Sequence, residues 1–171
     1  MKRTLPLAFF LLALASAAPA ATPQAVVAID PQSEPESVTV APDGSLILGS
    51  ASKPAIYRAA KGEAHARVFI DASGEGAVTF LGVLADGPTN SLWACQIGTV
   101  PNSRNRHTTL RGFDLTTGAA KFRWALPGDN NLCNDFTIGP DRALYVSDTL
   151  GSRIYRVRPG ADKAIAIPLP P

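Results

Sequence analysis

The sequence predicts an all-β protein built from repeated four-stranded units, the pattern of a β-propeller. The first observation behind this prediction is an internal repeat. Residues 35–58, PESVTVAPDGSLILGSASKPAIYR, return without a gap as residues 133–156, CNDFTIGPDRALYVSDTLGSRIYR, at an offset of 98 residues. A looser copy, VLADGPTNSLWACQIG, lies between them at residues 83–98. Repeat periods of about 40–50 residues indicate an array of identical supersecondary units.

The second observation is the strand and turn pattern inside the first unit. An alternating strand at 38–40 precedes the turn sequence PDG at 42–44, in which proline presets φ and glycine accepts a positive φ. A short apolar strand follows at 46–48, a third begins at 56–58, and a fourth fits 67–70. Four short antiparallel strands per period are typical of a propeller blade. A sandwich of evenly spaced hairpins is the alternative, and the gapless repeat favours the propeller.

Residues 1–20 have the features of an export signal. A basic start precedes an apolar stretch that is too short to span a bilayer, and small residues then offer cleavage after Ala17 or Ala20. We therefore expect a periplasmic or secreted protein. Residues 21–171 are expected to form a partial propeller, with blade one at about 35–71, blade two at about 78–126 and blade three at about 133–168.

The charge balance excludes some partners. The chain carries 16 Lys and Arg against 14 Asp and Glu, and Lys2 and Arg3 would leave with the signal. The mature net charge is then near zero, which gives no reason to expect a nucleic-acid partner. No segment beyond the signal is long and apolar enough for a membrane helix, so the mature form is expected off the membrane.

The number of blades is small for this fold. Three blades fall short of the four to eight that closed propellers typically have, so we expect the N-terminal half of a six-bladed propeller, an open and incomplete arc. A lone strand at about 25–30 and the strand ending at Ile167 would be unpaired edges, because blades that would pair with them are missing. Such edges template association, so self-association and an inactive isolated chain are expected.

Candidate metal ligands occur at equivalent positions of two blades. Glu36 opens the first strand of blade one, and the offset places Asn134 at the same position of blade three, with roughly Phe80 in blade two. First strands line the channel of a propeller, so both side chains would point toward one axis. Carboxylate and amide oxygens suit a hard cation such as Ca²⁺. The alternative is that both side chains only hydrogen-bond loop backbone.

Other polar residues fall near the same predicted mouth. Ser50, Gln96 and Asp148 end the three second strands, and Asp135 follows Asn134. We expect these four residues to be channel or rim contacts.

The segment TVPNSRNRH, residues 99–107, interrupts blade two. It contains Arg104, Arg106 and His107 and no acidic residue. It is either a solvated surface loop or a basic lid over a pocket, since long loops on rigid scaffolds often carry binding roles.

The cysteines are Cys95 and Cys133. An even number of cysteines in an exported chain predicts one disulfide. Both residues are expected on the same face of adjacent blades, and two buried free thiols are the alternative.

The blade sequences and the residues at the strand starts resemble the senescence marker protein (regucalcin)/gluconolactonase family of six-bladed propellers over residues 35–160. In that family a Glu of blade one, Asn side chains of middle blades and an Asp of a later blade form a divalent-metal and substrate site. The resemblance matches Glu36 and Asn134 to the first two, and the later Asp has no matching position. The resemblance implies that this site binds calcium or another divalent cation.

The function implied by the resemblance is metal-assisted hydrolysis of lactone-like small molecules, in which the cation polarises the carbonyl group and a carboxylate handles the proton. The residue that acts as acid or base is not identified by the matching positions. The alternative function is that of a non-catalytic propeller of the NHL type, which binds a ligand or a protein.

Overall fold

A computed structural model of the chain describes residues 27–28, 30–100, 102, 104–128, 130–158, 160–161, 163–167 and 169. The predicted export signal, with its two cleavage sites, lies outside the described residues. Within these ranges no helix has the length and apolar character needed to cross a bilayer.

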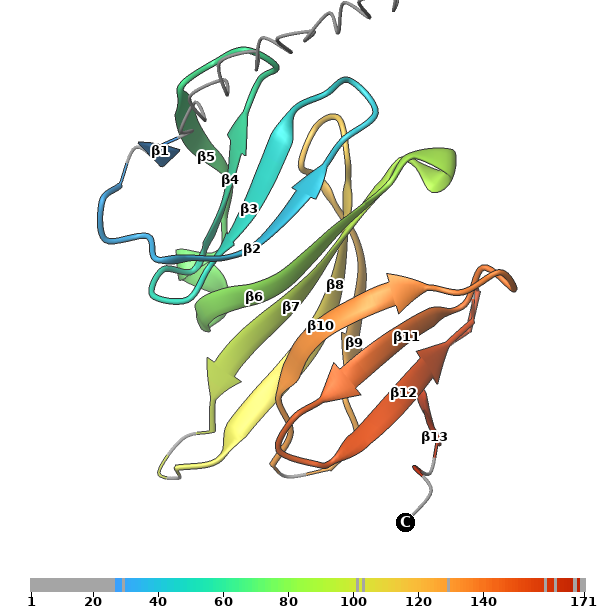
Figure 1. Cartoon of the computed structure of the whole chain (residues 1–171). Helices are drawn as coiled ribbons and strands as arrows, with labels where there is room; N and C mark the ends of the chain where they lie inside the picture. The colour runs from blue at the N-terminus through green and yellow to red at the C-terminus, as the bar shows by residue number, and fades with distance from the viewer. Residues whose placement is uncertain are drawn as a thin grey trace, which may run out of the picture.

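Three successive groups of four antiparallel strands form the blades (Figure 1). The strands of blade one are β2 (Pro35–Val40), β3 (Leu46–Ser50), β4 (Ala55–Ala59) and β5 (His65–Asp71). Those of blade two are β6 (Ala77–Asp86), β7 (Ser91–Thr99), β8 (Arg106–Asp114) and β9 (Ala120–Ala125). Those of blade three are β10 (Cys133–Ile138), β11 (Leu144–Asp148), β12 (Arg153–Val157) and β13 (Ile165–Ile167). Two short 3₁₀ turns, η1 (Ser73–Glu75) and η2 (Gly87–Thr89), flank β6.

The first strand, β1 (Val27–Ala28), does not remain an unpaired edge. It pairs in parallel with β5 of blade one, with Val27 opposite His65 and Ala28 opposite Ala66. The expectation that this segment would be free to close a last blade is therefore wrong for these two residues. The outer edge of β5 offers free N–H and C=O groups, and β1 takes them up.

The predicted turn chemistry recurs in blades one and three. Gly44 has φ +82° in the turn between β2 and β3, and Arg142 has φ +61° at the matching position between β10 and β11. Glycine adopts such angles without steric cost, whereas arginine does so less readily. The same turn is thus kept in both copies of the repeat although only one copy has the favoured residue.

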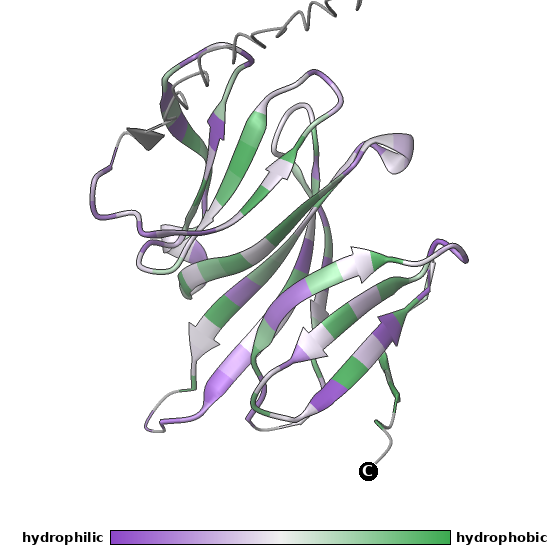
Figure 2. Cartoon of the chain, in the orientation of Figure 1, coloured by the Kyte–Doolittle hydropathy of each residue, from purple (hydrophilic) through white to green (hydrophobic). Residues whose placement is uncertain are grey.

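One hydrophobic core lies between blades one and two. Ile47 and Ile56 of blade one pack with Phe80, Leu92 and Phe113 of blade two. The alternation of hydrophobic and polar residues along the strands, visible in Figure 2, sends every second side chain into this layer. Burial of these side chains contributes about 1.5–3 kcal/mol for each large residue.

A second core lies between blades two and three. It contains Leu110 of β8 together with Phe136, Val146 and Tyr155 of blade three. The Tyr155 hydroxyl donates a hydrogen bond of 2.9 Å to the Pro127 carbonyl, so the polar end of this buried ring is satisfied. Each pair of neighbouring blades is therefore joined by its own apolar layer.

The outward faces of the arc remain open in the described part of the chain. Val38 and Val40 on β2 are 61% and 60% exposed. Their counterparts in blade three, Phe136 and Ile138, pack in the second core against blade two. Blade one thus presents the kind of surface that another blade covers elsewhere in the molecule. The all-β, open-arc architecture predicted from the sequence is confirmed.

Candidate functional site

Each innermost strand carries a β-bulge at the same place. In β2, Pro35 pairs with Ser50 of β3, and the next pair is Val38 with Leu48, so the register shifts between Pro35 and Val38. The same interruption separates Phe80 from Val83 in β6. In β10 it separates Cys133 from Phe136. A bulge re-aims side chains and increases the local twist, so the two residues inside each bulge are the ones placed differently from the rest of the strand.

The bulges correct one sequence alignment. The residues inside them are Glu36 and Ser37 in blade one and Asn134 and Asp135 in blade three, so the counterpart of Glu36 in blade two is Leu81. Phe80, the residue roughly assigned to that position, is fully buried and packs edge-on against Phe113 at 6.2 Å between ring centroids. Blade two therefore offers no polar side chain at this position.

The inner strands β2, β6 and β10 lie side by side (Figure 1). Hydroxyl groups of β2 join it to the backbone of β6: the Val83 N–H donates to Ser37 Oγ at 3.2 Å, and the Ala85 N–H donates to Thr39 Oγ1 at 3.1 Å. These bonds satisfy backbone donors that lie outside the ladder of the blade. They hold the bulge of blade one against blade two.

On its other side β6 meets β10 at Gly82. A Cβ atom on this residue would lie 2.7 Å from the Asn134 carbonyl oxygen and 2.9 Å from the Asp135 Cα atom. Glycine is therefore required for this close backbone approach. The approach brings the bulge of blade three next to β6.

This packing sets the electrostatics of Glu36. Burial raises the pKa of Glu36 above its ordinary value of 4.5, and the negative charge of Asp135 raises the pKa further. Both side chains keep solvent contact. Asp135 Oδ1 accepts a hydrogen bond of 2.8 Å from the Phe136 N–H, which fixes that carboxylate. The carboxylate of Asp135 in blade three thus acts on Glu36 in blade one.

The donor set at this point consists of oxygens. Glu36 and Asp135 supply carboxylates, and the half-buried Asn134 supplies an amide whose oxygen makes no hydrogen bond within the described part of the chain. Hard cations such as Ca²⁺ take six to eight oxygens, including waters, so these residues fit part of such a shell. Among the described residues, no group of three or more His, Cys, Asp or Glu side chains is arranged to hold a metal ion.

Three of the predicted channel or rim residues are buried. Ser50, Gln96 and Asp148 pair with equivalent residues of the inner strands, and all three are almost fully buried. Ser50 Oγ donates to the Ser33 carbonyl and accepts from the Lys53 N–H at 2.9 Å. The expectation that these residues contact the channel or its rim stays a prediction, and in the structure their side chains are enclosed by protein groups.

Gln96 and Asp148 have structural partners. Gln96 Oε1 accepts a hydrogen bond from the Arg111 guanidinium. Asp148 Oδ1 accepts 2.9 Å hydrogen bonds from the N–H groups of Leu132 and Gly151, and the chain connecting blades two and three is held by the first of these. These contacts fix the ends of the blades, and Asp148 Oδ2, which makes no hydrogen bond among the described residues, lies 3.2 Å from Arg153 Nε.

The predicted lid is shorter than the sequence suggested. Arg106 and His107 are the first residues of β8, paired with Thr99 and Gly98 of β7. Only Arg104 of the three basic residues lies in the connection between the two strands, and it is exposed. The strand pairing therefore continues through residues that were assigned to a loop.

Cys95 and Cys133 form a disulfide with 5.5 Å between their Cα atoms. It joins β7 to the start of β10, as the sequence analysis expected. Gly49 holds the position of Cys95 in blade one, and a Cβ atom there would lie 2.8 Å from the Phe80 carbonyl oxygen. One blade junction is therefore closed by direct backbone contact and the next by a covalent bond.

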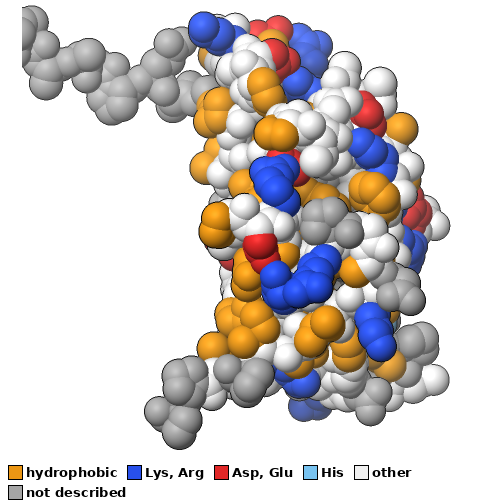
Figure 3. Space-filling model, turned by 90° about the vertical axis from the view of Figure 1, so that its right-hand side faces the viewer, with side chains coloured by type: hydrophobic (Ala, Val, Ile, Leu, Met, Phe, Trp, Pro, Cys, Tyr) orange, Lys and Arg blue, Asp and Glu red, His pale blue; other side chains and the backbone are white. Residues whose placement is uncertain are grey.

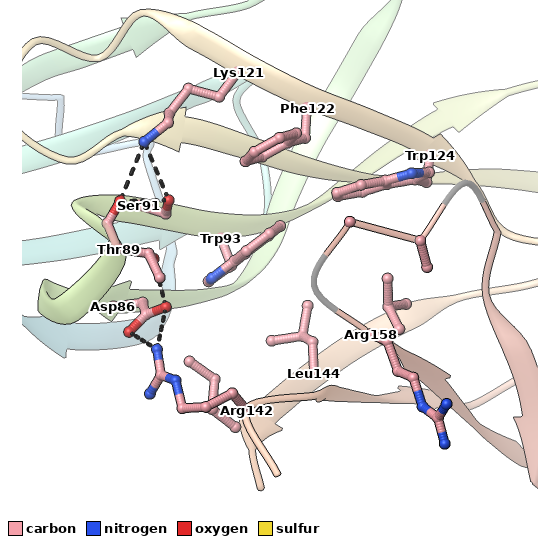
Figure 4. A pocket seen from close by; sticks show the side chains of 14 residues that line it. Asp86, Thr89, Ser91, Trp93, Lys121, Phe122, Trp124, Arg142, Leu144 and Arg158 are labelled. Carbon is pink, nitrogen blue, oxygen red and sulfur yellow. Dashed lines mark hydrogen bonds and ion pairs between the residues drawn. The ribbon is translucent and has the colours of Figure 1, made fainter.

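The sequence analysis missed a cleft between blades two and three. Trp93, Phe122 and Trp124 line one side of it (Figure 4). Phe122 and Trp124 alternate along β9, so their common face was a readable signal. The cleft lies at the end of the blades that carries η2, whereas the connection between β7 and β8 lies at the opposite end.

No family model matches the chain, and no curated protein matches its sequence significantly. Among solved structures, a protein described as a putative oxidoreductase (glucose dehydrogenase) from Thermus thermophilus matches 75% of this chain and 44% of its own, at 16% identity and a TM-score of 0.56. The PQQ-bound aldose sugar dehydrogenase of Streptomyces coelicolor matches 74% of this chain and 45% of its own, at 18% identity and a TM-score of 0.52. A streptogramin B lyase matches 83% of this chain and 57% of its own, at 14% identity and a TM-score of 0.47.

This chain spans less than half the length of the first two structures. Identities this low establish the fold and nothing of the activity. The two dehydrogenase structures are propellers, and the likeness shows that this chain folds as part of a β-propeller.

Proposed function

We propose that this chain carries the cation-binding residues of a metal-dependent hydrolase of lactone-like esters, of the regucalcin/gluconolactonase type. One observation carries the proposal: Glu36 and Asp135 lie in equivalent bulges of β2 and β10, and the negative charge of Asp135 adds to the effect of burial in raising the pKa of Glu36. Unpaired like charges at one point are costly, and a divalent cation between them relieves that cost.

Glu36, Asn134 and Asp135 would hold the cation. A bound divalent ion supplies Lewis acidity toward the carbonyl group of a lactone. The chain's own residues position the donors. Gly82 lets the bulge of blade three approach β6, and the Phe136 N–H holds the carboxylate of Asp135. The resemblance matches Glu36 and Asn134 to ligand positions of the family, and the effect of Asp135 on Glu36 supports including Asp135 in the proposed set.

The test is hydrolysis of D-glucono-1,5-lactone by the protein with Ca²⁺, Mn²⁺ or Zn²⁺, for the wild type, Glu36→Gln and Glu63→Gln. Glu63 is an exposed residue of the turn between β4 and β5 and serves as the matched control. Metal-dependent turnover that Glu36→Gln abolishes and Glu63→Gln retains supports the proposal. Turnover that survives Glu36→Gln contradicts it.

The second candidate function is that of a non-catalytic propeller of the NHL type that binds a ligand or a protein. The observation in its favour is that the described residues supply two carboxylates and one amide at the centre and no third His, Cys, Asp or Glu beside them. A protein that binds calcium through Glu36 but hydrolyses no lactone in the same assay would support this function.

A periplasmic or secreted location is part of the same proposal. Disulfides form and persist in oxidising compartments, and the Cys95–Cys133 bond is consistent with export. The mass of the protein recovered from the cell exterior or periplasm tests it. Cleavage after Ala17 or Ala20 is expected, and an intact Met1 in the exported fraction would contradict the predicted signal.

A further inference from the structure

A cleft of about 350 Å³ opens between blades two and three. Small-molecule sites typically occupy about 300–1,000 Å³ and are lined mainly by apolar and aromatic side chains. Trp93, Phe122 and Trp124 form the wall contributed by blade two, and Leu144 and Val157 belong to the wall of blade three. The cleft thus lies between blades two and three, and it is separate from the exposed valines of blade one.

The blade-two wall is a cluster of three stacked aromatic rings (Figure 4). The ring of Phe122 lies 5.7 Å from that of Trp93 and 5.2 Å from that of Trp124, with interplanar angles of 12° and 14°. Gly112 pairs with both Trp93 and Phe122 across the strands. A Cβ atom on Gly112 would lie 2.6 Å from Phe122 Cδ2 and 3.2 Å from Trp93 Cζ3, so this glycine leaves room for both rings over β8.

The polar groups at one edge of the cleft satisfy one another. Arg142 Nη2 bonds the Asp86 carboxylate at 2.6 and 2.8 Å, and Thr89 Oγ1 donates to the same carboxylate at 2.6 Å. Lys121 Nζ donates to the Asn90 carbonyl at 3.2 Å and to Ser91 Oγ at 3.3 Å. These groups close the edge around η2 and leave no free carboxylate there.

Three lining groups make no hydrogen bond or ion pair within the described part of the chain, and all three are donors: the indole N–H groups of Trp93 and Trp124 and the Arg158 guanidinium. The Trp93 indole N–H is enclosed and has no acceptor among the described residues. Arg158 is exposed and makes no ion pair within the described part of the chain. The lining also holds three basic side chains, Lys121, Arg142 and Arg158, against the single carboxylate of Asp86. An occupant must therefore bring acceptors and negative charge. Figure 3 shows hydrophobic and basic side chains next to one another on the face with the β10–β11 turn.

We propose that this cleft binds a small aromatic carboxylate, with its ring on the wall of Trp93, Phe122 and Trp124 and its carboxylate toward Arg158. Offset stacking on the wall favours a planar ring, and a guanidinium favours a carboxylate. A sugar would place most of its hydroxyl groups against apolar and aromatic side chains, where they would lack partners. A cationic ligand would meet the positive charge of the lining. The site shares no residue with Glu36, Asn134 and Asp135, so it does not depend on the proposed hydrolase function.

The probe is 4-hydroxyphenylacetate, titrated into the whole protein by calorimetry and followed by tryptophan fluorescence. The chain has two tryptophans, Trp93 and Trp124, so the fluorescence reports on this wall alone. Tyramine, with the same ring and a positive charge, tests the charge preference. Gluconate, an anion without a flat ring, tests the stacking. We expect saturable binding of 4-hydroxyphenylacetate and at least roughly tenfold weaker binding of the other two.

Variants locate the site. Arg158→Gln should weaken binding of 4-hydroxyphenylacetate by roughly five- to tenfold through loss of a charge-assisted bond. Phe122→Leu should weaken it several-fold and lower the fluorescence response. Arg67→Gln, an exposed arginine of β5 in blade one, is the control and should leave binding unchanged. Equal affinity for tyramine or gluconate, no binding at millimolar probe, or Arg158→Gln behaving as Arg67→Gln would overturn the proposal.

Discussion

Gly82 on β6 lies against Asp135 on β10 so closely that a Cβ atom on Gly82 would be 2.9 Å from the Asp135 Cα atom. The backbone of one inner strand therefore packs directly on the bulge of the next. This contact fixes how closely Asp135 approaches the inner strand that lies between it and blade one.

Gly82→Ala should destabilise the protein by about 1–3 kcal/mol, because the added methyl group forces the two backbones apart. Urea unfolding followed by fluorescence measures the change. Gly74→Ala is the matched control, since a Cβ atom there meets no atom within 4 Å. Equal unfolding midpoints for the two variants would show that β6 and β10 do not approach as described.

The pH dependence of stability should reveal the environment of Glu36. Burial, followed by the charge of Asp135, raises its pKa above 4.5, so the folded protein binds this proton more tightly than the unfolded chain does. Stability is then lost as pH rises from about 4.5 through the raised pKa. Glu36→Gln removes that loss and should raise the melting temperature at about pH 7 in the absence of divalent cations.

The control for the pH experiment is Glu63→Gln, which changes an exposed glutamate of a turn. Its melting curve should follow the wild type between about pH 4 and pH 8. A Glu36→Gln variant that is less stable than the wild type throughout this range would refute the raised pKa.

The disulfide should contribute strongly to the free energy of unfolding. Cys95 and Cys133 are 38 residues apart, and closing a loop of this size stabilises by roughly 3–4 kcal/mol in the chain-entropy model. Reduction, or the double variant Cys95→Ala with Cys133→Ala, should lower the urea midpoint accordingly. Thiol labelling of the exported protein in denaturant without reductant should modify neither cysteine, and two modified cysteines per chain would contradict the bond.

The buried guanidinium group of Arg111 provides another test. The side chain of Arg111 is 3% exposed, and its Nη1 atom lies 2.6 Å from Glu75 Oε2. Glu75→Ala leaves this charge without its carboxylate, and because Glu75 itself is 45% exposed we expect a loss of about 1–3 kcal/mol. Glu63→Ala should change the free energy of unfolding by less than about 0.5 kcal/mol. Equal effects would mean that water replaces Glu75 without cost.

The open face of blade one should promote self-association. Val38 and Val40 are 61% and 60% exposed, and large apolar patches of this kind mark interaction sites. Light scattering at increasing protein concentration should show species larger than a monomer. Replacing both valines with lysine should restore the monomer, whereas Val78→Lys, at a residue on β6 that is 39% exposed, should not. A wild-type monomer at every concentration contradicts this prediction.

The repeat made much of the fold predictable. The offset between residues 35–58 and 133–156 placed the strands of blades one and three, and the cysteine pairing followed from their positions in adjacent blades. The bulges were not predictable in the same way. A register shift of one residue moves a side chain to another face, which is why Phe80 was aligned with Glu36 although Leu81 holds that position.

The polar residues show a second limit. Ser50, Gln96 and Asp148 were correctly placed at one equivalent position, but their burial depends on partners such as Arg111 and Leu132 that are distant in sequence. The position of Asp135 depends likewise on Gly82, because any side chain there would collide with the backbone of β10. The repeat predicts where a residue lies along its strand. Whether its side chain is buried depends on how the three blades pack, which the repeat does not show.

The measurement that tests the central claim most directly is calorimetric titration of Ca²⁺ into the wild type, Glu36→Gln, Asp135→Asn and Glu63→Gln. If Glu36 and Asp135 share a cation, the wild type and Glu63→Gln should bind calcium with the same affinity. Each of the other two variants should lose roughly tenfold or more in affinity, since each removes a charged oxygen ligand. Affinity should also fall as pH drops through the raised pKa of Glu36. Calcium binding of equal strength in all four proteins, or no binding in any, would contradict the account.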